Sequence, residues 1–253
     1  MTDWRTYRFM FWTLVFAALS AVPFYAWIYD ESWGWARGFP VSWMAAGMTA
    51  FITFFHEIGH TMFGWFYGYV TLPAFDFQHG GGMAWMMTDQ LLPLQLCLYG
   101  LLIYAIYCAR EYRGIQIMLG LLILFHMATA YTPFHMTVIN FMGPGFVVLT
   151  ASFFLYRAWL DLAPRGALER FLNGYFGFAM VIYTLIDGWA LIHSKAARLV
   201  YYEQKGQHGF GDFDKIANAL HVGFESVVWV WLALAVLGLL LPWLAFCMDR
   251  SRI

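Results

Sequence analysis

Long apolar runs separated by short polar breaks make up most of this chain of 253 residues. A run of about 20 apolar residues is long enough to cross the hydrocarbon core of a bilayer as a helix. The pattern predicts spans at about residues 9–29, 41–65, 91–109, 115–131, 136–155, 171–192 and 224–247. We therefore predict an all-α membrane protein, a polytopic bundle of about six to seven transmembrane helices.

A different pattern follows the second apolar run, from Val70 to Gly82. Pro73 and three glycines interrupt a stretch of β-branched and aromatic residues, and the stretch is too short to cross a membrane. Such a sequence favours a short extended hairpin or a re-entrant loop. Non-helical backbone at membrane depth is tolerated only where it is buried in protein or lines a water-filled cavity. We expect a hairpin or loop of this kind after the second span.

Composition supports a membrane protein and excludes several other classes. Hydrophobic residues make up 62% of the chain and charged residues only 11%, whereas soluble domains carry about 25% charged residues. This predicts a single integral domain over 1–253, with core spans at about 41–193, in the lipid bilayer of the cell membrane. A formal net charge of −1 argues against a nucleic-acid partner. Lys and Arg fall in nearly equal numbers on alternate sides of the predicted spans, so the positive-inside rule does not orient the chain.

The second apolar run contains the sequence His56-Glu57-Ile58-Gly59-His60. Residues four apart share a helix face, so both histidines can bind one Zn²⁺ while Glu57 reaches a water molecule beside the metal. Chance is the alternative, but an ionisable side chain at the centre of a membrane helix costs about 2.5–3.5 kcal/mol. The spacing therefore predicts a catalytic zinc site in which Glu57 is the general base.

A catalytic zinc needs a third protein ligand, and Asp187 in the sixth apolar run is the candidate. A carboxylate in an apolar helix is costly unless it meets a cation, a metal or a proton. A protonated Asp187, or one paired with a polar neighbour, is the alternative. The predicted metal ligands are His56, His60 and Asp187.

An H-E-x-x-H sequence in an early span and Asp187-Gly188 in a late span resemble the site-2 protease family of intramembrane zinc metalloproteases. The resemblance covers spans two to six. It implies that His56, His60 and Asp187 bind zinc and that Glu57 serves as base and then acid. It also implies a membrane-embedded substrate helix that is unwound at the cleavage site, and a hairpin that pairs with the extended substrate.

The chain departs from the family pattern in one motif. Many members carry Gly-Pro-x-x-Asn in the span before the aspartate, whereas here Gly143-Pro144 is followed by Gly-Phe-Val, with Asn140 just upstream. Asn140 is a candidate substrate or transition-state contact, and so is His79 beside the three glycines, for which an ordinary loop residue is the alternative. The roles of His126, His135 and His193 stay open between hydrogen bonds across helices and a second metal. The polar segment that carries Asp212 and Asp214 favours a solvated loop.

Three functions are compatible with these features. The first is an intramembrane zinc metalloprotease that hydrolyses a peptide bond of a membrane-embedded substrate. The second is a non-proteolytic zinc-binding accessory or assembly subunit, with other membrane subunits as partners; the absent Gly-Pro-x-x-Asn and the 21% aromatic content motivate it. A membrane oxidase with two metals is disfavoured because it needs several closely spaced histidine clusters, and this chain has one.

Overall fold

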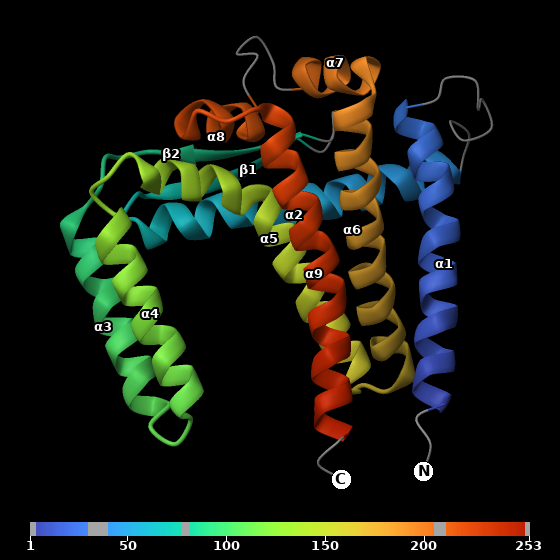
Figure 1. Cartoon of the computed structure of the whole chain (residues 1–253), viewed down its shortest axis with the longest axis horizontal. Coiled ribbons are helices and arrows are strands. Elements are labelled where there is room, and N and C mark those ends of the chain that lie inside the picture. Colours follow the sequence, from blue (N-terminus) through green and yellow to red (C-terminus); the bar gives the residue numbers. More distant parts are fainter. Residues whose placement is uncertain (1–3, 30–39, 77–80, 205–210, 251–253) are drawn as a thin grey trace.

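The computed structural model describes residues 4–29, 40–76, 81–204 and 211–250. Helices dominate, as the all-α class requires, and one two-stranded hairpin is present (Figure 1). The elements in chain order are α1 (Trp4–Tyr29), α2 (Val41–Phe66), β1 (Thr71–Asp76), β2 (Gly81–Met86), α3 (Leu92–Cys108), α4 (Arg113–Thr129), α5 (Phe134–Trp159), α6 (Ala167–His193), α7 (Lys195–Gln204), α8 (Asp212–Leu220) and α9 (Phe224–Arg250).

Three of the described helices are long and apolar enough to cross a membrane. They are α5, α6 and the Phe224–Asp249 part of α9. The helices α3 and α4 are apolar but shorter, with 17 residues each. Length and composition thus support membrane insertion.

The helix that carries the histidines is oriented differently from the long apolar helices. Figure 1 shows the axes of α6 and α9 nearly aligned with that of α1, with α9 running in the opposite direction, whereas α2 lies across all three. The helix α5 packs against α2, α6 and α9, and α6 packs against α1 and α9. The α3–α4 pair extends away from the remaining helices, to which it is joined through the end of α2 (Figure 1). The residues on α2 therefore lie toward one end of α6 and α9.

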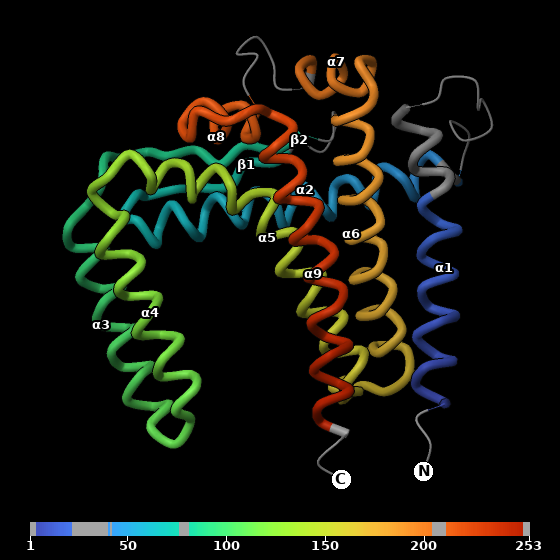
Figure 2. Tube along the Cα trace, in the orientation of Figure 1, coloured from blue at the N-terminus to red at the C-terminus, as the bar shows by residue number. Residues whose placement is uncertain are grey.

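The helix α5 changes direction along its length (Figure 2). Pro144 lies inside it, and proline removes a backbone donor and clashes with the preceding turn, which bends a helix. Before the bend, Met142 contacts α2, and beyond it Leu155 packs against Gly177 of α6. Because of the bend, the first part of α5 contacts α2 and the second part packs in the core around Ala151 and Leu155.

Close approach of α2 and α5 depends on Gly59. A Cβ atom at this position would overlap the carbonyl oxygen of Met142 and lie 2.5 Å from Cβ of Phe146. Because the nearest obstacle is backbone, the contact cannot be relieved by a side-chain rotation.

We expect Gly59→Ala to lower the free energy of unfolding by about 1–3 kcal/mol, the usual cost of overpacking. Gly47→Ala on the same helix is the control, because a Cβ there meets nothing within 4 Å; it should be neutral or stabilising by up to about 1 kcal/mol. Denaturant unfolding of the purified protein in micelles, followed by circular dichroism, measures both. Equal stability of the two variants would contradict the close contact.

The hairpin expected after Tyr69 is present. The strands β1 and β2 are antiparallel, with Thr71 opposite Met86 and Asp76 opposite Gly81. Both strands pack against α2. A Cβ at Gly64 of α2 would overlap the side chain of Thr71, so this glycine lets the first strand lie directly on the helix. The hairpin therefore begins one turn beyond the histidines and returns beside them.

Candidate metal centre

His56 and His60 present their imidazoles on one face of α2, as their spacing predicts. Their Nε2 atoms are 3.1 Å apart. The two rings are nearly perpendicular, with centroids 4.8 Å apart. Two nitrogen donors thus converge on one point.

A third donor comes from α8. The Oδ2 atom of Asp212 lies 3.0 Å from Nε2 of His56 and 3.2 Å from Nε2 of His60. Within the described residues, these three side chains form the one group of His, Cys, Asp or Glu whose donor atoms are arranged to hold a metal ion. The carboxylate is 156 residues beyond His56 in the chain.

The donor set fits zinc. Zn²⁺ binds histidine nitrogen and carboxylate oxygen at about 2.0–2.2 Å with tetrahedral geometry, so neighbouring donor atoms are about 3.3 Å apart. The three observed separations, 3.0, 3.1 and 3.2 Å, are close to that value. Two imidazoles and one carboxylate also match the donor types of catalytic zinc sites, which keep a fourth position open.

The imidazole of His60 is oriented from behind by α5. Its Nδ1 atom is 2.8 Å from the carbonyl oxygen of Ile139. Since a carbonyl can only accept, Nδ1 carries a hydrogen, and Nε2 is the ring atom that can bind a metal once it has lost its proton. A Cβ at Gly143 would overlap the His60 ring and lie 2.8 Å from Nε2 of His56. Ile139 and Gly143 share one face of α5, and that face forms the wall behind the two histidines.

Glu57 is buried beside the same group, with 6% of its surface exposed. It is close enough to His60 to interact with it electrostatically. The backbone of β2 covers its side chain: a Cβ at Gly82 would lie 2.5 Å from Cγ and 2.9 Å from Oε1 of Glu57. The carboxylate thus lies between the histidines and the hairpin, and a glycine in β2 is what makes room for it.

The helix α8 is amphipathic and packed, so Asp212 is not in a solvated loop. Phe213, Ile216 and Ala217 are buried in a cluster with α9 residues that include Trp231. Asp212 itself is 9% exposed. The expectation of a solvated loop is wrong for residues 212–220, because apolar side chains three and four apart fix this short helix against α5 and α9.

Residues of α7 hold the first turn of α8. The Tyr202 hydroxyl donates to Oδ1 of Asp214 at 3.1 Å, and the Gly211 amide donates to Oδ2 of Asp214 at 3.3 Å. The Tyr201 ring stacks on Phe213, and a Cβ at Gly211 would overlap the Tyr201 hydroxyl. These contacts position the residue between Gly211 and Phe213, which is Asp212.

The two histidines shift the pKa of the Asp212 carboxyl. Burial acts to raise its pKa, but the neighbouring His60 and His56 outweigh burial and hold the pKa well below its usual range. An ionised carboxylate is the form that binds a metal. The lowered pKa favours that form of Asp212.

Asp187, the third ligand expected from the sequence, is not part of this group. It lies half-buried on α6 and interacts electrostatically with Tyr183, one turn earlier. The glycine that follows it has a packing role, because a Cβ at Gly188 would lie 2.5 Å from Cδ2 of Leu232 on α9. The Asp-Gly sequence thus occurs where α6 meets α9, and the geometry assigns the third position to Asp212.

The other polar candidates have separate surroundings. Asn140 is half-buried on α5, next to Ile139, whose carbonyl contacts His60. His79 lies outside the described residues. His126 is buried, with Nδ1 2.7 Å from the Tyr99 hydroxyl.

The two remaining histidines also have protein partners. Nε2 of His135 is 2.7 Å from the Tyr69 hydroxyl. His193 is exposed, with its ring stacked on Trp189. In the part of the chain that the structure describes, neither of these histidines nor His126 joins a second metal-binding group.

No family model, no curated protein and no solved structure matches the chain.

Proposed function

We propose that this protein is a zinc-dependent membrane metalloprotease that hydrolyses a peptide bond of a membrane-embedded substrate. One observation carries the proposal. The donor atoms of His56, His60 and Asp212 lie within 3.2 Å of one another, and the next residue after His56 is the buried Glu57. This combination of three ligands and a general base is the requirement for metal-assisted peptide hydrolysis.

Each residue has a separate task in this mechanism. His56, His60 and Asp212 would hold the metal, and zinc in such a donor set would supply Lewis-acid catalysis and lower the pKa of a water molecule. Glu57 takes a proton from the attacking water and returns it to the leaving amine. Ile139 keeps the His60 ring in its binding orientation through the 2.8 Å contact at Nδ1.

The hairpin is the part of the site that orients the substrate. Its second strand passes Glu57 at Gly82, so a peptide segment lying along the hairpin passes the base. When a substrate helix unwinds in lipid, its backbone loses the hydrogen bonds of the helix. Pairing of the extended substrate with a strand edge replaces those hydrogen bonds. This supports the extended, membrane-embedded substrate that the resemblance to site-2 proteases implies.

The proposed setting is a multi-pass protein of the cell membrane. The three long apolar helices support insertion, and we propose that α1, α3 and α4 cross the membrane with them. This gives six spans, the lower number expected from the sequence, because α2 lies across the long helices. Because α2 lies across α6 and α9, its histidines lie toward one membrane surface, where water has a shorter path to the site.

We expect Glu57→Gln to lower proteolysis by about 10²- to 10⁴-fold, the usual contribution of a general acid–base group. Zinc content should stay unchanged, because Glu57 is not among the three converging donors. Cleavage is measured by comparing membrane-protein fragments by mass spectrometry in cells that express wild type or variant. Glu111→Gln, an exposed change in the α3–α4 turn, is the control and should keep full activity.

The same experiment separates the two classes of function. Fragments that appear with wild type and Glu111→Gln, but not with Glu57→Gln, support the protease. If wild type and Glu57→Gln support the same biological activity while both bind zinc, the base is dispensable and the accessory subunit is the correct description.

A further inference from the structure

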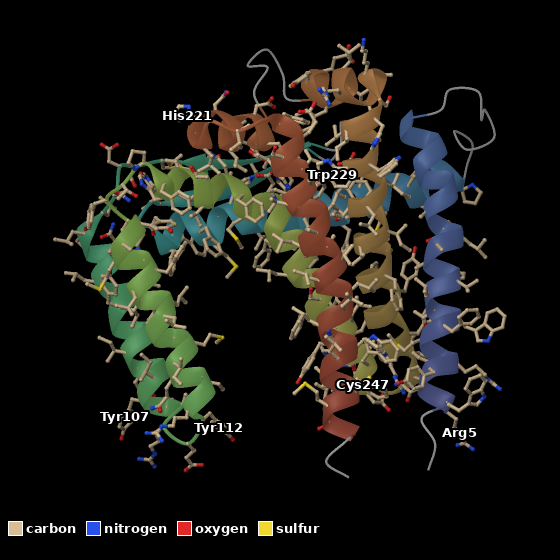
Figure 3. The ribbon with its side chains drawn as sticks, viewed as in Figure 1. Arg5, Tyr107, Tyr112, His221, Trp229 and Cys247 are labelled. Carbon is tan, nitrogen blue, oxygen red and sulfur yellow. The ribbon has the colours of Figure 1, made fainter. Side chains whose placement is uncertain are left out.

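Arginine is concentrated at the end of the molecule that lies farthest from the metal centre. Arg5 lies in the first turn of α1 there. The turn between Tyr107 and Tyr112 and the connection from α5 to α6 lie at the same end, together with the helix turns beside them (Figures 1 and 3). The seven arginines of these segments are Arg5, Arg8, Arg110, Arg113, Arg157, Arg165 and Arg170.

The opposite end carries fewer basic residues and holds the metal centre. His221, next to α8, marks this end in Figure 3. Its described basic side chains are those of Lys195, Arg198 and Lys215 in α7 and α8. Arg37, Lys205 and Arg252 lie outside the described residues. If all three are counted at the opposite end, that end has six basic residues, against eight at the arginine-bearing end, where Arg250 ends α9 (Figure 1).

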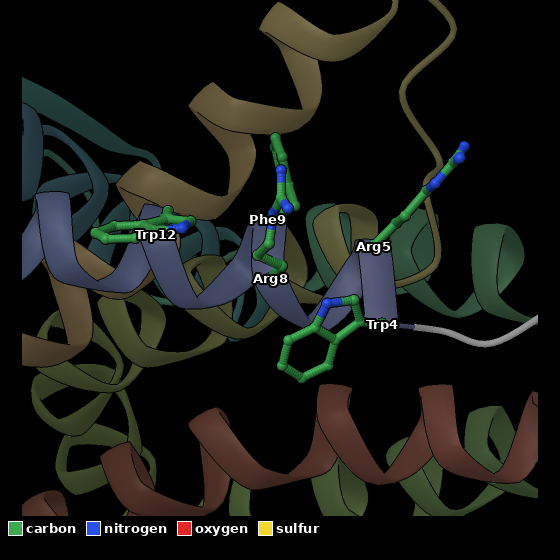
Figure 4. A pocket seen from close by; sticks show the side chains of 5 residues that line it. All are labelled: Trp4, Arg5, Arg8, Phe9 and Trp12. Atoms are coloured by element: carbon green, nitrogen blue, oxygen red, sulfur yellow. The ribbon is translucent and has the colours of Figure 1, made fainter.

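The arginine-bearing end also has aromatic side chains suited to a membrane interface. A surface hollow of about 620 Å³ is lined by Trp4, Arg5, Arg8, Phe9 and Trp12 (Figure 4). Trp4 and Trp12 are 68% and 61% exposed, and Figure 4 shows the Arg5 side chain extending away from the helix. Trp and Tyr collect at the level of lipid headgroups, and arginine binds phosphate through two parallel hydrogen bonds.

We infer that this end contacts the anionic phospholipid headgroups of the cytoplasmic leaflet and that the metal centre opens on the opposite, extracytoplasmic side. Short cytoplasmic segments are enriched in Lys and Arg, counted without regard to acidic residues. The anionic cytoplasmic leaflet attracts arginines close to the bilayer surface. The sequence alone does not reveal this asymmetry. A count from the sequence moves the loops to the other side of the membrane after every apolar run, including α2, but α2 lies across the long helices. The loops after α2 are therefore assigned to the wrong side in such a count.

This inference rests on the proposed membrane insertion but not on proteolysis, so the two fail separately. Single cysteines are placed at Asn218 in α8 and at Glu111 in the α3–α4 turn, both exposed, in a background with Cys97, Cys108 and Cys247 changed to alanine. Intact cells are treated with a membrane-impermeant maleimide, and labelling of detergent-solubilised protein is the reference for each cysteine. The zinc content of both variants is measured in parallel.

We expect Asn218→Cys to react in intact cells and Glu111→Cys to react only after permeabilisation. The reverse pattern, or equal labelling of both positions in intact cells, overturns the orientation. If the zinc content is normal but the labelling pattern is reversed, only the inferred orientation is refuted. If zinc is absent but the labelling pattern is the expected one, only the metal site is refuted.

The lipid contact has its own test. Purified protein is titrated with short-chain phosphatidylglycerol and with phosphatidylcholine, and binding is followed by tryptophan fluorescence. We expect the anionic lipid to bind more tightly, and each of Arg5→Gln and Arg8→Gln to weaken its binding by about fivefold. Equal binding of the two lipids, or unchanged binding in both variants, overturns the headgroup contact.

Discussion

Asp212→Ala is expected to abolish zinc binding, whereas Asp187→Ala leaves it intact. Wild-type protein should contain about one zinc per chain, because one group of three donors is present in the described residues. Removing the Asp212 carboxylate leaves two of the three converging donors. Affinity should fall more than about a hundredfold, since loss of an outer-shell partner alone costs 10- to 100-fold.

Elemental analysis of the purified variants measures the effect, and His56→Ala is the positive control because it removes a ligand common to both assignments. Asp212→Asn keeps the volume of the side chain and removes its charge, so it separates loss of ligation from misfolding of α8. Zinc that survives Asp212→Ala but is lost in Asp187→Ala would transfer the third position back to α6 and refute the geometry described above.

Gly143→Ala is expected to eliminate the metal centre without altering any ligand. The added methyl group would overlap the His60 ring and lie 2.8 Å from Nε2 of His56, where only the far ends of two imidazoles are available to move. Displacing donor atoms by about 1 Å is enough to disrupt a site that must hold its geometry within about 0.5 Å. We therefore expect zinc content below about a tenth of the wild-type value, since productive metal sites tolerate so little misplacement.

Gly120→Ala in α4 is the matched control, because a Cβ there meets nothing within 4 Å. It should bind zinc normally and be equally or more stable. Circular dichroism and thermal unfolding of the Gly143→Ala protein show whether it retains its helices. Normal zinc content in a folded Gly143→Ala protein would show that α5 does not form the wall of the site.

The parts of the site set by local chemistry could be predicted, and the part set by tertiary packing could not. His56, Glu57 and His60 belong to one helix, so their spacing alone determines that two imidazoles share a face. Asp212 is 156 residues away from His56, and no local rule connects them. A costly carboxylate in an apolar run makes Asp187 the natural candidate from the sequence, but in the structure it is half-buried on α6 near Tyr183 and is not part of the donor group.

A local signal for α8 was nevertheless present. Phe213, Ile216, Ala217 and Leu220 are spaced three and four apart, which is the apolar stripe of a short amphipathic helix. Asp212 and Asp214 stand in its first turn, where acidic residues are favoured. Interpreted in this way, the stretch predicts a packed helix that begins with an aspartate. The direction of α2 has no such signal, because an apolar run of 26 residues has the same composition whether it crosses the membrane or lies across its neighbours.

The separation between the donor atoms along the chain has a consequence for how the protein is made. During synthesis, α2 with His56, Glu57 and His60 is complete long before α8 is translated, so the newly made chain carries both histidines without Asp212. Only after α6 and α7 have been added can Asp212 reach the histidines. The proposed metal site would therefore be complete only after the surrounding helices exist. A metal bound there would hold the late-made α8 to the early-made α2, and its stabilising free energy would rise with the logarithm of the free metal concentration relative to the dissociation constant.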